Sequence, residues 1–194
     1  SRGLGDVYKR QIKTQQKLTS LSVSGVYESN LFLIPMGKSL YSLKEFSINN
    51  CDLEEWDGLE SYLMEHSKSL EKITFEQISW DPSNVINQCS KLKSLRGAQT
   101  EMNFLGNLTS VERLWMDPAI RTMDLFPNVK ALTIVRSTPE VNQVISTSMR
   151  KLEDLVVIYG VLAGLEVPSM KKLKFVSSSE VIDGNFFVTN NKIE

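Results

Sequence analysis

The chain has 194 residues, of which 41% are hydrophobic, and its 22 Lys and Arg residues nearly balance its 23 Asp and Glu residues, for a formal net charge of -1. Such a chain can bury a continuous core, but it carries no excess charge that would attract nucleic acid or an anionic membrane surface. Its apolar stretches are far shorter than the roughly 20 residues that span a bilayer, so we expect neither a nucleic-acid-binding nor a membrane protein.

Residues 1–11 differ from the rest of the chain. Their sequence, SRGLGDVYKRQ, has no apolar segment of the kind found in signal peptides and shares no pattern with residues 12–194. We expect them to be a non-native leader or a disordered tail. The organised domain is therefore predicted over residues 12–194.

An internal repeat dominates the remaining sequence. Each unit contains a six-residue segment that is apolar at its first, fourth and sixth places. The eight segments are LTSLSV (18–23), LKEFSI (43–48), LEKITF (70–75), LKSLRG (92–97), VERLWM (111–116), VKALTI (129–134), LEDLVV (152–157) and MKKLKF (170–175). Of the 24 positions so defined, 23 are apolar, Gly97 being the exception, whereas composition alone would give about 10. We therefore predict eight short strands.

These segments resemble the L-x-x-L-x-L-x-x-N/C-x-L motif of leucine-rich repeats. The second unit, LKEFSINNCDL, is the best match, with Cys51 at the Asn/Cys place and Leu53 closing the motif. The segment starts are 25, 27, 22, 19, 18, 23 and 18 residues apart, close to the 20 to 29 residues of this repeat class. The resemblance implies an α/β solenoid, a right-handed superhelix with a curved parallel sheet on its concave face.

Helices are expected only in the longer units. Asp57 precedes the apolar stripe of Leu59, Tyr62, Leu63 and His66 and is predicted to cap a helix there. Asp81-Pro82 precedes Val85, Ile86 and Cys89, and Pro139 precedes Val141, Val144 and Ile145 in the same way. The three units of 18 or 19 residues should contain little or no helix.

We expect the repeat array to be truncated at both ends. Ile193 lies 23 residues after Met170, where another unit would begin, and the sequence stops one residue later. A solenoid needs terminal units with a polar outer surface, and neither end has a recognisable one.

The cysteines favour an intracellular protein. Cys51 and Cys89 are too few for a disulfide framework and fit a reducing compartment, so we expect cytoplasmic or nuclear localisation. Cys89 also lies three residues before Leu92, as in the C-x-x-L-x-x-L phrase of the repeats in F-box proteins. This resemblance implies the substrate-recognition part of a ubiquitin ligase receptor, joined to the ligase through a region upstream of this chain.

No residues point to catalysis or to a cofactor. His66 is the single histidine, whereas acid–base work requires an oriented partner and a metal site requires several ligands. Both cysteines occupy framework places of the repeat, which favours buried structural thiols over a nucleophile. We therefore expect no enzymatic activity, no metal and no cofactor.

The concave strand face is the candidate binding surface. Because alternate strand residues point to opposite faces, the third, fifth and seventh places of each segment should be displayed together. Trp115 occupies one of these outward places, and large aromatic and arginine side chains dominate binding hot spots. The candidate partner-binding residues are Arg96, Arg113, Trp115, Asp117, Val135, Val156 and Ile158. The alternative is that Trp115 folds over a packing defect left by Gly97.

The sequence thus predicts a protein–protein interaction module whose partner is a protein bound on the concave face. The F-box resemblance makes substrate recognition for a ubiquitin ligase the first hypothesis. A general intracellular leucine-rich-repeat scaffold or a fragment of an immune-type sensor is the alternative, which a nucleotide-binding region upstream would favour.

Overall fold

The computed structural model describes residues 18–25, 43–51, 57–78, 80–98, 106–117, 123–167, 170–176 and 181–184. Residues 1–11, the expected leader, and Ile193, the expected start of another repeat, lie outside the described residues. The chain divides into two compact units, Ser1–Leu92 (unit 1) and Lys93–Glu194 (unit 2).

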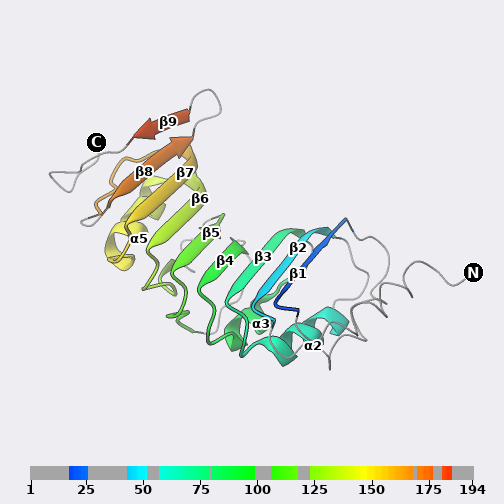
Figure 1. The fold of residues 1–194 in the computed structure, drawn as a ribbon. Coiled ribbons are helices and arrows are strands. Elements are labelled where there is room, and N and C mark those ends of the chain that lie inside the picture. Colours follow the sequence, from blue (N-terminus) through cyan, green and yellow to red (C-terminus); the bar gives the residue numbers. More distant parts are fainter. Residues whose placement is uncertain are drawn as a thin grey trace, which may run out of the picture. The chain divides into compact units, whose positions relative to one another are not determined.

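The described residues of unit 1 form three parallel strands with two helices beside them (Figure 1). The strands are β1 (Ser20–Ser24), β2 (Glu45–Cys51) and β3 (Lys72–Ile78). Helix α2 (Asp57–His66) connects β2 to β3, and helix α3 (Ser83–Gln88) follows β3. Parallel strands require a crossover connection, and α2 forms part of the crossover from β2 to β3.

The described residues of unit 2 form five parallel strands, one antiparallel strand and the helix α5 (Figure 1). In chain order the elements are β4 (Ser94–Ala98), β5 (Arg113–Met116), β6 (Ala131–Ser137), α5 (Pro139–Ser148), β7 (Asp154–Gly160), β8 (Lys172–Val176) and β9 (Val181–Gly184). The fold of both units is therefore α/β, with open, mainly parallel sheets and few helices among the described residues.

The eight predicted segments coincide with β1 to β8, and the strands pair with equivalent motif places side by side. In unit 1 the fourth-place residues form one row, Leu21, Phe46 and Ile73. In unit 2 the corresponding row is Leu95, Leu114, Leu132, Leu155 and Leu173. The repeat found in the sequence is thus a repeat in three dimensions within each unit.

The apolar places of the motif form the core, as predicted. From the segment at 43–48 to the segment at 152–157, all first, fourth and sixth places are buried. The side chains of Leu18, Leu21, Met170 and Phe175, in the first and last segments, are half-buried. Burying a side chain of this size contributes about 1.5 to 3 kcal/mol, so these rows supply most of the driving force for folding.

Gly97, the one exception to the motif, marks a bulge in β4. Its φ of 92° is in a region that favours glycine, and the pairing with β5 shifts between Arg96 and Ala98, so that Ala98 lies opposite Met116. Two residues of β4 therefore oppose one residue of β5, as in a β-bulge. The bulge explains why a residue without a side chain occupies a place that is apolar elsewhere.

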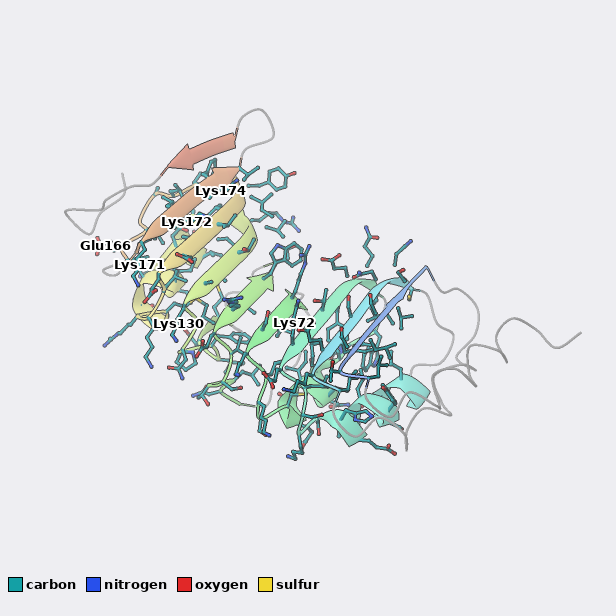
Figure 2. The ribbon with its side chains drawn as sticks, in the orientation of Figure 1. Lys72, Lys130, Glu166, Lys171, Lys172 and Lys174 are labelled. Atoms are coloured by element: carbon teal, nitrogen blue, oxygen red, sulfur yellow. The ribbon has the colours of Figure 1, made fainter. Side chains whose placement is uncertain are left out.

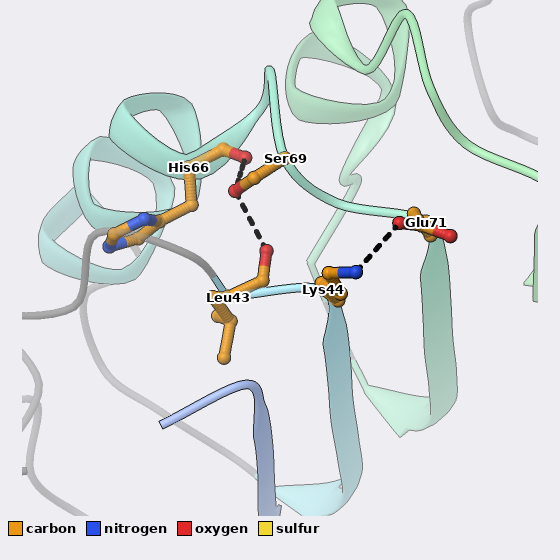
Figure 3. A network of polar contacts seen from close by, with 5 residues as sticks. All are labelled: Leu43, Lys44, His66, Ser69 and Glu71. Atoms are coloured by element: carbon orange, nitrogen blue, oxygen red, sulfur yellow. Dashed lines mark hydrogen bonds and ion pairs between the residues drawn. The ribbon is translucent and has the colours of Figure 1, made fainter. Parts of the chain in front are cut away.

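The backbone carbonyl at the second motif place joins successive repeats. The Lys44 carbonyl accepts hydrogen bonds from the N–H groups of Glu71 (2.7 Å) and Lys72 (3.0 Å). The carbonyls of Thr19, Lys93, Glu112, Lys130 and Glu153 make the equivalent pair of bonds to the next repeat. Side chains at this place also pair across repeats, with 3.5 Å between Lys44 and Glu71 (Figure 3), 3.3 Å between Glu112 and Lys130 and 2.7 Å between Glu153 and Lys171. Because these ion pairs are exposed, each contributes at most about 1 kcal/mol.

The turn after α2 ties that helix to β2 through Ser69. Its Oγ lies 2.8 Å from the carbonyl oxygen of Leu43 and 3.0 Å from that of His66, as Figure 3 shows. The hydroxyl can donate to either acceptor. This contact links the first place of one repeat to the end of the helix that follows it.

The three predicted helices are present, but two helix starts differ from the prediction. Helix α2 begins at Asp57 itself, the residue predicted to cap it. In α3 the helix begins after Pro82, and the Asp81 carboxylate accepts a hydrogen bond from the Ser83 N–H (3.0 Å), so Asp81 stabilises the first turn without being its capping residue. Thr138 caps α5 by accepting from the Val141 N–H (3.3 Å), with Pro139 in the first turn. The predicted apolar stripes are buried, except that Val144 of α5 is half-buried.

Among the described residues of the short units, Met123 is the one helical position, in line with the expectation of little or no helix. β9 was not predicted, because the repeat motif specifies only parallel strands. Leu173 of β8 lies opposite Gly184 of β9 in antiparallel register. Only four residues separate the two strands, whereas a parallel connection requires a crossover of a dozen or more.

A buried polar network closes the end of β6 and β7. The Asn142 side chain is fully buried, lies within hydrogen-bond distance of the Ser137 hydroxyl (2.5 Å), and donates to the carbonyl oxygens of Val161 and Ala163 (2.9 Å each). Gly160 lies opposite Ser137 with φ +120°, and a Cβ added there would lie 2.1 Å from the Ser137 carbonyl oxygen. Only glycine fits at this point of the repeat.

Replacing Gly160 with Ala should therefore lower the free energy of unfolding by more than about 2 kcal/mol, through backbone strain and the clash with Ser137. The matched control is Gly106→Ala, because a Cβ on Gly106 meets no atom within 4 Å; its stability should be unchanged or slightly increased. Urea unfolding of both variants measures the difference. Equal stability of the two variants would show that the Gly160 backbone adjusts without cost.

Candidate functional site

The candidate site is the outward face of the unit 2 strands, formed by their third, fifth and seventh motif places. In β5 the burial alternates along Arg113 (exposed), Leu114 (buried), Trp115 (half-buried) and Met116 (buried). The same alternation holds in β6 and β7 up to their seventh places. This strand geometry places six of the seven sequence-predicted residues on the outward face of neighbouring strands of unit 2, and the seventh, Asp117, directly follows β5.

Arg96 and Trp115 form a stacked pair on this face. They are opposite each other in the β4–β5 register, and the Arg96 guanidinium carbon lies 5.0 Å from the centroid of the Trp115 ring. This is cation–π geometry, which is worth roughly 0.5 to 1 kcal/mol at an exposed site. Arg96 is exposed and Trp115 is half-buried, so the indole keeps part of its surface available while the arginine holds it in place.

Trp115 belongs to a row of fifth-place residues across the sheet in which apolar and polar side chains alternate. Its neighbour in β6 is Thr133, which lies opposite Val156 of β7, which in turn lies opposite Lys174 of β8. Val156 is half-buried, as are Val135 and Ile158 at the seventh places of β6 and β7. A partner on this face would therefore meet branched aliphatic side chains next to the aromatic one.

Charged side chains lie on the same face of unit 2. Arg113 is exposed at the third place of β5, with Ser94 and Ala131 opposite it. Along β8, the side chains of Lys172 and Lys174 are labelled in Figure 2. Lys172 lies opposite Asp154 of β7. The face thus combines apolar and charged side chains, as protein-binding surfaces do.

Asp117 is already paired within the protein. Its carboxylate accepts a hydrogen bond of 2.7 Å from Nη2 of Arg136, and this bond together with the negative charge raises the pKa of Arg136 above its ordinary value. Asp117, which was predicted to contact a partner, also orients Arg136. The side chain of Arg136 is 72% exposed and that of Asp117 is 31% exposed, so the arginine is the more exposed member of the pair.

Sequence reasoning missed Arg136, Tyr159 and Val161. Tyr159 and Val161 are among the exposed large hydrophobic residues of the described chain, at 48% and 45%, and Arg136 lies opposite Tyr159 in the β6–β7 register. The strict alternation of strand faces ends after the seventh place, because the ninth place, Ser137 in β6, is buried again. The signal available in the sequence was a large side chain at the eighth place of a repeat segment. Such a side chain indicates a residue that points outward next to the seventh place.

The remaining titratable candidates are buried structural groups. Sγ of Cys89 lies 3.2 Å from the carbonyl oxygen of Val85, and burial raises the pKa of its thiol to about 12. His66 is buried, its ring centroid lies 4.8 Å from that of Tyr62 in an edge-on contact, and burial lowers its pKa. Within the described ranges, no three His, Cys, Asp or Glu side chains are grouped as metal ligands would be.

The single histidine gives unit 1 a predictable pH dependence. Burial lowers the pKa of His66 below its ordinary value of 6.5 in the folded chain, and the charge of Glu65 offsets this only in part. As the pH falls below about 6.5, the unfolded chain binds a proton that the folded chain does not yet bind, so the free energy of unfolding decreases.

Thermal melts between pH 7 and pH 5 test this dependence. The melting temperature of the wild type should fall over this range, and that of His66→Phe, which keeps an aromatic ring beside Tyr62, should fall less. Because the chain has one His, the difference between the two pH profiles belongs to that residue. If the melting temperatures of the wild type and His66→Phe fall in parallel as the pH decreases, burial of His66 is not the cause of the pH dependence.

None of the helices in the described part of the chain has the length and apolar character needed to cross a membrane. Comparison of the sequence with models of known protein families and with characterised proteins finds no match. Any functional proposal therefore depends on the residues of the outward face of unit 2.

Proposed function

We propose that this chain is a protein–protein interaction module and that the outward face of unit 2 binds a protein partner. The observation that carries the proposal is the Arg96–Trp115 stack, which holds a half-buried aromatic side chain on the same face as the outward aliphatic residues Val135, Val156 and Ile158. Tryptophan and arginine are the residues most enriched in interface hot spots, especially where they lie centrally and are bordered by polar groups.

Binding is supported better than catalysis. Among the described titratable residues, His66 and Cys89 belong to the buried interior of unit 1, and their pKa shifts have burial as the largest cause. An acyl- or group-transfer site would need a nucleophile within reach of an oriented base. We therefore propose a non-covalent role that needs no metal or cofactor.

The finer fold assignment, a leucine-rich-repeat solenoid with right-handed winding, is part of the same proposal. It is supported by the parallel pairing of equivalent motif places and by the burial of the first, fourth and sixth places in successive repeats. Repeat proteins of this kind present extended strand faces to partners. The two buried free thiols fit the proposed cytoplasmic or nuclear localisation.

The F-box resemblance extends the proposal to substrate recognition for a ubiquitin ligase. The framework cysteine on which it depends, Cys89, is buried directly before the segment that begins at Leu92. The full-length transcript tests this extension. An F-box upstream of Leu18 would support it, whereas a nucleotide-binding region there would favour the immune-type sensor.

Replacing Trp115 with Ala tests the binding proposal. Because the indole is half-buried, the melting temperature should fall by no more than about 5 °C, whereas truncating a fully buried tryptophan costs about 3 to 5 kcal/mol. Proteins captured from a cell extract by the wild type should be lost with the variant, as quantified by mass spectrometry. Met64→Ala, which truncates an exposed apolar side chain of α2 in unit 1, is the matched control and should retain them.

Two outcomes would count against the proposal. A fall in melting temperature equivalent to more than about 3 kcal/mol would assign Trp115 to internal packing over the β4 bulge. Equal capture by the wild type and Trp115→Ala would show that this face is not the binding surface.

A further inference from the structure

Exposed hydrophobic side chains gather at the carboxyl end of β7 in unit 2. Among the described residues, three large hydrophobic side chains are exposed, and two of them, Tyr159 and Val161, are only two residues apart. Ile158, directly before Tyr159, and Val135 of β6 are half-buried. Exposed apolar side chains that lie together commonly mark a contact surface. Tyr159 and Val161, here called the exposed pair, therefore extend the candidate face beyond its seventh places.

The backbone that carries the exposed pair is fixed from the interior. The Val161 N–H donates to the carbonyl oxygen of Ser137 (3.2 Å), and the Val161 carbonyl accepts from the fully buried side chain of Asn142 (2.9 Å). Gly160, between the two exposed residues, packs its backbone against Ser137. A side chain on a fixed backbone loses less conformational entropy when a partner orders it. The exposed pair is thus a preorganised part of the surface.

The charged group opposite Tyr159 is already neutralised within the protein. Arg136 lies opposite Tyr159 in the β6–β7 register, and its guanidinium donates to the Asp117 carboxylate (2.7 Å). Asp117 directly follows β5, the strand that contains Trp115. Charges on a partner favour binding where they complement charges on the surface. Because the Arg136–Asp117 pair is internally balanced, a partner that passes over it needs no charge of its own.

The strand register determines how far Tyr159 lies from Trp115. Trp115 lies opposite Thr133, and Thr133 lies opposite Val156, so Tyr159 is two strands away and three residues further along. With about 4.8 Å between strands and about 3.3 Å per residue, the two positions are about 14 Å apart. Four residues of an extended chain cover about 13 Å and place both side chains on one face, whereas four residues of a helix cover only about 6 Å.

We infer that the partner segment bound by unit 2 is an extended, uncharged stretch of polypeptide with two large apolar side chains four residues apart. This inference rests on the proposed function, which assigns the outward face of unit 2 to a protein partner. One apolar side chain packs on Trp115, and the other packs on Tyr159 and Val161. The residues between them pass over the neutral Arg136–Asp117 pair. Burial of apolar surface at both ends supplies the main driving force for association.

A random peptide library displayed on phage and selected on the full 194-residue chain tests the inference. The selected peptides should share two large apolar residues, such as Trp, Phe or Leu, at positions i and i+4, with uncharged residues between them. A synthetic copy of a selected peptide should bind Tyr159→Ala about tenfold or more weakly than the wild type, and this ratio should be the same at low and high salt. Inserting one residue between the two apolar positions should weaken binding as well, because it moves the second side chain to the opposite face.

Met64→Ala is the matched control for Tyr159→Ala. It truncates the exposed large hydrophobic side chain of α2 in unit 1 and should leave peptide binding unchanged. Both variants should melt within a few degrees of the wild type, because both side chains are exposed. A large fall in the melting temperature of Tyr159→Ala would assign Tyr159 to internal packing and overturn the inference.

The other outcomes separate this inference from the proposed function. Selected peptides that require Trp115 but bind Tyr159→Ala as tightly as the wild type would overturn the inference and leave the binding proposal intact. So would Trp115-dependent peptides that share charged residues between the apolar positions, or that space their apolar residues as a helix does. A selection that yields no Trp115-dependent peptide would overturn both. A dimer of the wild type in sedimentation experiments that dissociates with Tyr159→Ala would replace the peptide by a second copy of this chain.

Discussion

The in-register pairing of equivalent motif places is the constraint on which the rest of this structure depends. When fourth-place residues such as Leu132 and Leu155 lie side by side, the first and sixth places align as well. Each buried row then consists of apolar side chains from equivalent places of successive repeats. A shift of one residue would exchange the buried and outward faces of a strand. The paired hydrogen bonds to each second-place carbonyl hold the same register through the backbone.

That register also decides the chemistry of the outward face. Arg96, Trp115 and Val156 are far apart in the sequence, yet they belong to one row because each occupies the fifth place of its segment. Side chains in such a row are held by a rigid sheet, so little conformational entropy is lost when a partner orders them. The Arg96–Trp115 stack adds to this preorganisation, because the ring is oriented before a partner binds.

In the interior, polar groups stabilise the fold and are not presented to a partner. Asn142 satisfies a hydroxyl and two carbonyl groups at the end of the strands, and Gly160 allows the backbone to approach Ser137 closely. His66 and Cys89 are kept in their uncharged forms by burial. These groups stabilise the repeats, whereas the proposed recognition residues lie on the outward face of unit 2.

The sequence by itself determined the eight strand segments, their buried places and the three helices, because hydrophobic periodicity and helix-start signals are local properties of the chain. It also indicated which residues share the outward face, since alternation along a strand is local too. Only the tertiary structure decided what those residues do there. The bulge at Gly97, the pairing of Asp117 with Arg136, the outward turn of Tyr159 and the reversal of β9 each depend on the neighbouring strand. Contacts between strands are set by distances across the sheet, which the order of residues along one strand does not specify.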